Sequence, residues 1–180
     1  TSFSFSVSIS NVTTNDKNTV ISSSLSTLPV IINKAAYCNL KSGIPSNSQL
    51  ISNRAGWIIN VEEGVEGAPN NLIDGKTGTD VALNNKGFWF TVDLGEAKVL
   101  TGIKTNHWVN AYAPREVEIL QSENGTTWKS LSSLAISGGT QNITFISPIT
   151  TRYLKYQIIT ISTNGRTDVT EFNVYEPKSE

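Results

Sequence analysis

The chain has 180 residues, above the commonest domain size of about 100–150, and 38% of them are hydrophobic, which suffices for a packed core. Its 14 basic and 15 acidic residues leave a net charge of −1, so no overall field favours nucleic acid or an anionic membrane. A single histidine and a single cysteine exclude an internal disulfide, most zinc sites and most nucleophile–base pairs.

Apolar and polar residues alternate near the N-terminus. In FSFSVSIS, residues 3–10, four apolar side chains share one face and serines take the other, which predicts a half-buried strand. TTNDKN has turn chemistry, and TVISSSLS can return as a second strand. We expect residues 1–50 to form a β-hairpin-like extension, or the end of a preceding domain, with a linker in KSGIPSNSQLISN and a boundary near residue 50.

Beyond residue 50, short strands follow one another with turns such as ENGTT, ISGGTQ and STNGRT between them. Helical periodicity is almost absent. This pattern favours an antiparallel β-sandwich over alternating βαβ units. The expected strands are residues 56–61, 86–95, 98–106, 115–122, 127–134, 141–146, 152–161 and 168–176.

Six motifs occur in a fixed order: NNLIDGKTGT, WFTVDLG, LTGIKTN, EVEILQSENGTTWKSL, RYLKYQI and VTEFNVYE. Through them, residues 52–176 resemble the F5/8 type C, or discoidin, family, whose bacterial members are grouped as family 32 carbohydrate-binding modules. The resemblance implies an all-β fold over residues 51–180, an antiparallel jelly-roll β-sandwich of the galactose-binding-domain type. Ligand loops are then expected at one end of the sandwich.

The segment NNLIDGKTGTD, residues 70–80, gathers oxygen-bearing side chains in a turn sequence. Calcium prefers six to eight hard oxygens, from carboxylates, carbonyls and hydroxyls. By itself the segment is equally typical of an Asp-Gly turn, with an ordinary surface glutamate elsewhere. The resemblance implies a structural calcium held by the side chains of Asp74, Thr79 and Glu171 and by the carbonyls of Asn71, Lys76, Thr79 and Thr170.

The alternation of apolar and polar residues in the last strand is independent support for Glu171 as an ion ligand. If Phe172 and Val174 face the core, Glu171 must face the other way. Two departures from the family pattern are Val81, where members often have tryptophan, and the cation of Lys76 beside the loop. An ion held entirely by protein oxygens has no open position for activating water, so its expected role is structural.

The segment NHWVNAYAPR, residues 106–115, joins two expected strands, and loops on a rigid sandwich are where binding groups usually sit. It offers aromatic rings to pack on a sugar and polar groups to bind hydroxyls, and it lies where the resembled family keeps part of its ligand site. Structural alternatives are a loop anchor for Trp108, a satisfied buried group for His107 and an ion pair with a neighbouring glutamate for Arg115. The candidate ligand-binding residues are His107, Trp108, Asn110, Tyr112 and Arg115, with Asn164, Arg166, Asn84 and Asn85 from neighbouring turns, where ordinary turn roles are the alternative.

The other tryptophans are expected to be structural. Trp57 and Trp128 lie at core-like positions of the resembled family, and Trp89 is expected to pack although alternation sets it opposite Phe88 and Phe90. Cys38 is expected to be a buried thiol.

We therefore expect a non-catalytic carbohydrate-binding module with a structural calcium, recognising galactose-type or amino-sugar-type glycans. The alternative is an adhesion domain that binds a protein or a phospholipid, although a single loop tryptophan without a basic patch argues against membranes. A spacer with an inactive ligand face also stays open, whereas no catalytic set is apparent. The composition, and the lack of an initiating methionine, lead us to expect a processed piece of a multidomain glycan-utilisation protein that is extracellular, on the cell surface or periplasmic.

Overall fold

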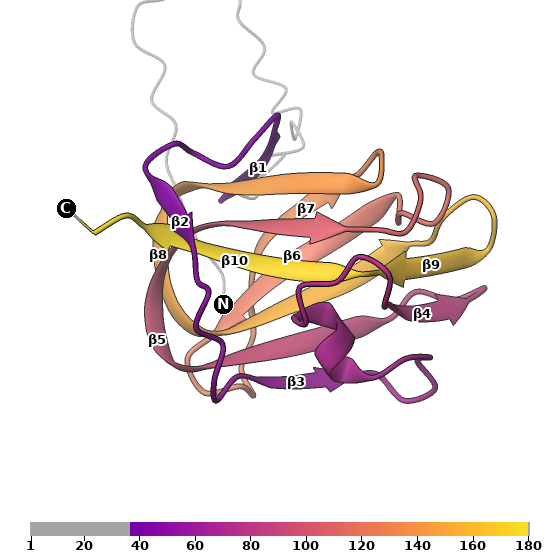
Figure 1. Ribbon diagram of the computed structural model, residues 1–180, viewed down its shortest axis with the longest axis horizontal. Coiled ribbons are helices and arrows are strands. Elements are labelled where there is room, and N and C mark those ends of the chain that lie inside the picture. The colour runs from indigo at the N-terminus through magenta and orange to yellow at the C-terminus, as the bar shows by residue number, and fades with distance from the viewer. Residues whose placement is uncertain (1–36, 180) are drawn as a thin grey trace, which may run out of the picture. The chain divides into compact units, whose positions relative to one another are not determined.

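A computed structural model describes residues 37–179, and the hairpin expected before them lies outside the described residues (Figure 1). Strands dominate this part of the chain, together with one short 3-10 helix, η1 (Pro69–Leu72). The strands are β1 (Cys38–Lys41), β2 (Ser48–Leu50), β3 (Ile58–Val61), β4 (Val81–Asn84), β5 (Trp89–Asn106), β6 (Glu116–Ser122), β7 (Lys129–Ala135), β8 (Thr140–Thr160), β9 (Arg166–Val169) and β10 (Glu171–Pro177).

Every strand pair within residues 37–179 is antiparallel. The main sheet runs in the order β2-β10-β5-β8-β6-β7, with β1 beside β8 and β3 beside β5, and β4 and β9 form a separate ribbon. The 18-residue β5 and the 21-residue β8 curve together, so that the sheet folds over on itself into two layers (Figure 1). The predicted all-β jelly-roll sandwich is confirmed.

The length of β5 and β8 differs from the prediction. Residues 86–95 and 98–106 were expected as separate strands joined by a turn, but β5 runs through that turn with a register shift between Asp93 and Lys98. β8 likewise joins the strands expected at 141–146 and 152–161. A β-bulge or similar irregularity bends a strand without ending it. Its sequence resembles that of a turn, so one long strand was predicted as two.

The core lies between the layers, where alternation predicted it. Phe90 stacks on Tyr156 with ring centroids 5.2 Å apart, and Phe172 meets both rings edge-on. Such contacts add about 0.5–1.5 kcal/mol per pair beyond burial. Phe88 and Phe90 are buried.

The predictions for Trp57 and Cys38 are confirmed, because both are buried. Burial raises the pKa of the Cys38 thiol to about 11. Trp89 is half-buried and packs beneath the Lys155 ammonium, 4.8 Å from the ring centroid. Trp128 is only half-buried, so its expected core position is wrong.

Two strands that precede the predicted boundary near residue 50, or end at it, pair with strands of the sandwich. β1 pairs with β8, opposing Cys38 to Phe145, and β2 pairs with β10, opposing Leu50 to Tyr175. Both are short edge strands with few apolar residues, so their sequence is typical of a loop. Among the described residues, no helix is long and apolar enough to cross a membrane.

Candidate functional site

The loop after η1 is closed by its own hydrogen bonds. The Asp74 carboxylate accepts the Lys76 backbone N–H at 2.8 Å and, through its other oxygen, the Thr79 hydroxyl at 2.8 Å. Burial acts to raise the pKa of Asp74, but these two hydrogen bonds and the Lys76 charge together lower it. Gly75 has φ 77°, which favours glycine at this sharp turn.

Glu171 begins β10 and lies beneath this loop. Phe172 and Val174 are fully buried in the core, as alternation predicted, and Glu171 is on the opposite face. It is nevertheless only 3% exposed, and neither carboxylate oxygen accepts a hydrogen bond of good geometry within residues 37–179. Burial raises the pKa of Glu171, although the nearby Gly75 backbone N–H and the charge of Arg54 act to lower it, and the charge of Asp74 adds to the rise.

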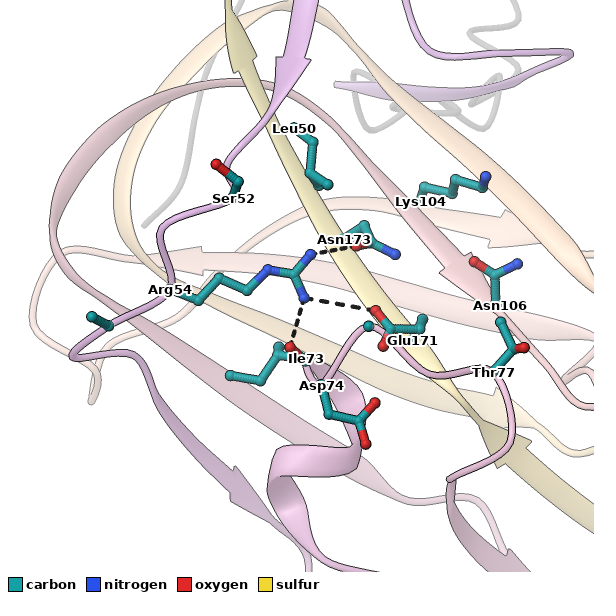
Figure 2. A pocket seen from close by; sticks show the side chains of 12 residues that line it. Leu50, Ser52, Arg54, Ile73, Asp74, Thr77, Lys104, Asn106, Glu171 and Asn173 are labelled. Atoms are coloured by element: carbon teal, nitrogen blue, oxygen red, sulfur yellow. Dashed lines mark hydrogen bonds and ion pairs between the residues drawn. The ribbon is translucent and has the colours of Figure 1, made fainter.

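Arg54 joins this loop to β10. Its guanidinium donates to the Ile73 carbonyl at 2.9 Å and to the Asn173 side chain, and Nη1 lies 3.6 Å from the Glu171 carboxylate (Figure 2). Arg54 is not among the predicted site residues, because it directly follows the polar stretch 41–53 that was interpreted as a linker. Its position just before Trp57, over whose ring it lies at 5.7 Å, is the one signal that could have found it.

The same side chains line a groove of about 620 Å³ on the outer face of the sheet (Figure 2). Its walls are the 50–55 segment, the loop after η1, and the ends of β5 and β10. The lining residues are Leu50, Ser52, Arg54, Ala55, Ile73, Asp74, Gly75, Thr77, Lys104, Asn106, Glu171 and Asn173.

The donor set suits calcium better than a transition metal. No cluster of three or more His, Cys, Asp or Glu side chains is placed to hold a metal within residues 37–179, so a bound ion would need backbone carbonyls as further ligands. A buried carboxylate is costly unless cations and hydrogen bonds compensate it, and Arg54 compensates Glu171 only through an ion pair at 3.6 Å, without a hydrogen bond. The residues around Glu171 therefore fit a hard cation.

The remaining expected ion ligands surround the same loop. Asn71 donates its side-chain amide to the Asp80 carbonyl at 2.8 Å, which fixes the start of the loop against its end. Thr170 is buried beside Glu171, and its N–H donates to the Asn106 carbonyl at 2.8 Å. The Lys76 residue is exposed and its backbone carbonyl lies 3.2 Å from the Thr79 hydroxyl.

His107 is a buried anchor of the β5–β6 loop. Its side chain has no exposed surface, and Nδ1 donates to the Asp168 carbonyl at 2.6 Å. The expectation that it contacts a ligand is therefore wrong, and the structural alternative holds.

Trp108, in contrast, is 56% exposed, so it is not a loop anchor tucked under the rim. Its backbone N–H donates to the carboxylate of Asp168 at 3.2 Å, and the Asp168 N–H donates to the Tyr112 carbonyl at 3.3 Å. Asp168 lies on β9 and is completely buried. One side chain and its backbone thus fix both ends of the loop that presents Trp108.

Other candidates of this loop are partly committed to structural contacts. Asn110 accepts the Gly139 backbone N–H, and Tyr112 is half-buried. Arg115 donates to the Thr163 hydroxyl at 3.3 Å, not to a glutamate. That contact brings the β5–β6 and β8–β9 loops together.

The second group of candidates has mainly turn roles. Asn164 accepts the Arg166 N–H at 3.1 Å within its own turn. Arg166 is paired with Glu66 at 2.8 Å and with Asp80 at 2.9 Å, and these bonds raise its pKa. Asn84 donates to Glu66, and Asn85 takes a positive φ of 57° at the end of β4.

Similar solved structures share this fold at low sequence identity. The family 32 carbohydrate-binding module of C. perfringens NanJ, in complex with galactose, superposes with a TM-score of 0.60 at 22% identity, covering 72% of this chain and 99% of that one. An F5/8 type C domain from Bacteroides fragilis gives a TM-score of 0.63 at 19% identity, covering 75% of this chain and 100% of the other. A Clostridium perfringens domain in complex with GalNAc-β-1,3-galactose gives a TM-score of 0.55 at 19% identity, covering 71% of this chain and 94% of the other.

No relative was found among curated protein sequences. The sequence model of the F5/8 type C domain family matches residues 52–172, which is more than half of the chain. Motif order, fold and this match agree, and the chain belongs to the F5/8 type C domain family.

Proposed function

We propose that this domain is a non-catalytic carbohydrate-binding module whose ligand packs against Trp108. The observation that carries the proposal is a tryptophan that is 56% exposed at the tip of a loop fixed by a buried residue. An exposed aromatic ring on a rigid backbone provides an apolar platform with little loss of conformational entropy on binding. Asn110, Tyr112 and Arg115 lie on the same loop and supply polar groups.

Galactose-type or amino-sugar-type glycans are the proposed ligands. Two similar solved domains hold galactose and GalNAc-β-1,3-galactose. We place such a module in a larger secreted or surface-attached glycan-utilisation protein.

The proposal includes a structural calcium at the loop after η1. Asp74, Thr79 and Glu171 would contribute side-chain oxygens, and Asn71, Lys76, Thr79 and Thr170 backbone carbonyls. The support is the buried carboxylate of Glu171, which has an ion pair with Arg54 but no hydrogen bond of good geometry, beneath a loop that already carries Asp74. A bound ion would join this loop to the first residue of β10, directly beside the β5 end from which the Trp108 loop departs.

Adhesion to a protein or a phospholipid is a second candidate. Val109 is 43% exposed next to Trp108, so the tip carries two adjacent apolar residues. Such a tip can insert into an apolar surface.

A glycan array, probed with and without calcium, tests the proposed function. We expect galactose-terminated or N-acetylgalactosamine-terminated glycans to be bound, and the signal to fall in a chelator. Parallel sedimentation with anionic lipid vesicles tests the second candidate. Vesicle binding without any glycan signal would replace the first proposal by the second.

A further inference from the structure

The groove of Figure 2 contains a cation that the Trp108 site does not use. Asn173 on β10 lies directly opposite Lys104 on β5, and Lys104 lies directly opposite Asn142 on β8. Val174 and Ile103, the next residues along the two strands, are buried in the core. Asn173 and Lys104 therefore share the outer face of the sheet, where side chains of directly opposite residues are about 5 Å apart at Cβ.

Lys104 is half-buried and forms no ion pair or hydrogen bond with any residue in the described part of the chain. The other charges of the groove have partners. Arg54 lies against Glu171 at 3.6 Å, and Asp74 accepts from Thr79 and Lys76. Lys104 is thus the charged side chain of the groove that has neither an ion pair nor a hydrogen bond within residues 37–179.

Neutral polar groups surround that charge. Asn173 uses its side-chain oxygen to accept from Arg54, which leaves its amide N–H groups, and Asn106 donates to Thr140, which leaves its side-chain oxygen. Lys104 and Asn106 lie across the groove from Ser52 and Arg54, with Asn173 between them (Figure 2). Planar amides and hydroxyls around one charge are suited to a polar ligand with an anionic group.

We propose that this groove is a second sugar subsite, in which Lys104 and the Asn173 amide bind the carboxylate of an acidic sugar. The volume of about 620 Å³ is ample for one or two sugar rings. Leu50, 41% exposed at one end, offers an apolar contact, and Asn106, Ser52 and Thr77 offer hydroxyl partners. The inference rests on the proposed carbohydrate-binding function and adds a substrate class and a surface separate from the Trp108 loop.

The proposed calcium strengthens this subsite. Asp74 and Glu171 carry two negative charges near the groove, and a divalent cation between them would neutralise both. Arg54 and Lys104 would then leave the groove with a net positive charge, which favours an anion. Acidic-sugar binding is therefore expected to be tighter with calcium than with a chelator.

The test is a titration with tri-galacturonate, followed by calorimetry and by amide chemical shifts, with neutral galactotriose as the matched ligand. We expect tri-galacturonate to shift the signals of Lys104, Asn106 and Asn173, and to bind more weakly at high salt. Lys104→Gln should weaken it about tenfold or more, and Lys104→Arg should retain most of the binding. Lys155→Gln, which removes a cation from β8 beside Trp89, is the matched control and should have no effect.

The Trp108 site and the Lys104 subsite can be tested independently. Trp108→Ala should leave tri-galacturonate binding unchanged, and Lys104→Gln should leave galactoside binding unchanged. Tri-galacturonate that fails to bind, whose binding is insensitive to Lys104→Gln, or that shifts only the signals of residues 107–115 would overturn the subsite. Loss of galactoside binding alone would instead count against the Trp108 site.

Discussion

Asp168 accepts the backbone N–H of Trp108 at 3.2 Å, although 60 residues separate the two in the chain. The same residue receives the His107 side chain on its carbonyl and donates its own N–H to Tyr112. The exposed tryptophan is therefore positioned by β9, not only by its own loop. A binding side chain held in this way loses little entropy when a ligand packs on it.

Replacing Asp168 should affect both stability and binding. Asp168→Ala removes a buried acceptor, and we expect the free energy of unfolding to fall by about 1–3 kcal/mol and glycan affinity to fall about tenfold. Asp168→Asn keeps an oxygen for the Trp108 N–H and should retain most of the affinity. Chemical denaturation and calorimetry measure the two effects. Wild-type affinity in the alanine variant would show that Asp168 does not position the loop.

The chain's alternation predicts the core and the antiparallel sandwich, because a period of two fixes which side chains of a strand face inward. The sequence also identifies Trp108, because a tryptophan stands out in a polar loop. It cannot identify Asp168, whose burial depends on the pairing of β9 with β4. For the same reason His107 could not be distinguished as an anchor, because its partner lies on a strand 61 residues away.

Removing calcium should lower the melting temperature. An ion present at about 100 times its dissociation constant stabilises the fold by about 2.7 kcal/mol, which corresponds to several degrees for a domain of this size. Asp74→Ala should abolish the difference between calcium and chelator, whereas Glu63→Gln, an exposed carboxylate away from the loop, should keep it. A melting temperature unchanged by chelator in the wild type would remove the ion from the account.

Arg54 should matter most when calcium is absent. Arg54→Ala breaks the bond to the Ile73 carbonyl and leaves Glu171 buried without its cation, so we expect a loss of about 2–4 kcal/mol in chelator. In calcium the loss should be smaller, because the ion compensates Glu171. Arg54→Lys should recover part of it, since lysine restores the charge without the planar fork. An equal loss of unfolding free energy in calcium and in chelator would show that Arg54 and the ion do not compensate the same carboxylate.

Acid should weaken the Asp93–Arg152 pair. Two hydrogen bonds of 2.8 Å from Arg152 hold the pKa of Asp93 below its ordinary value. Because the folded pKa is the lower one, the pair's contribution is present above about pH 3.9 and is lost as the pH falls through the folded value. The stability difference between wild type and Asp93→Asn should therefore shrink as the pH is lowered from about 7 to about 2.5. Denaturant titrations at several pH values measure this stability difference. A difference that does not change with pH would contradict the prediction.

A calorimetric titration of Trp108→Ala with a galactose-terminated glycan measures directly whether Trp108 binds the sugar. Ile58→Ala is the matched control, because Ile58 is 57% exposed and Trp108 is 56% exposed. We predict that Trp108→Ala weakens binding about thirtyfold or more, while unfolding stays within about 0.5 kcal/mol of wild type, and that Ile58→Ala changes neither quantity. Wild-type affinity in Trp108→Ala would show that the glycan does not pack against Trp108.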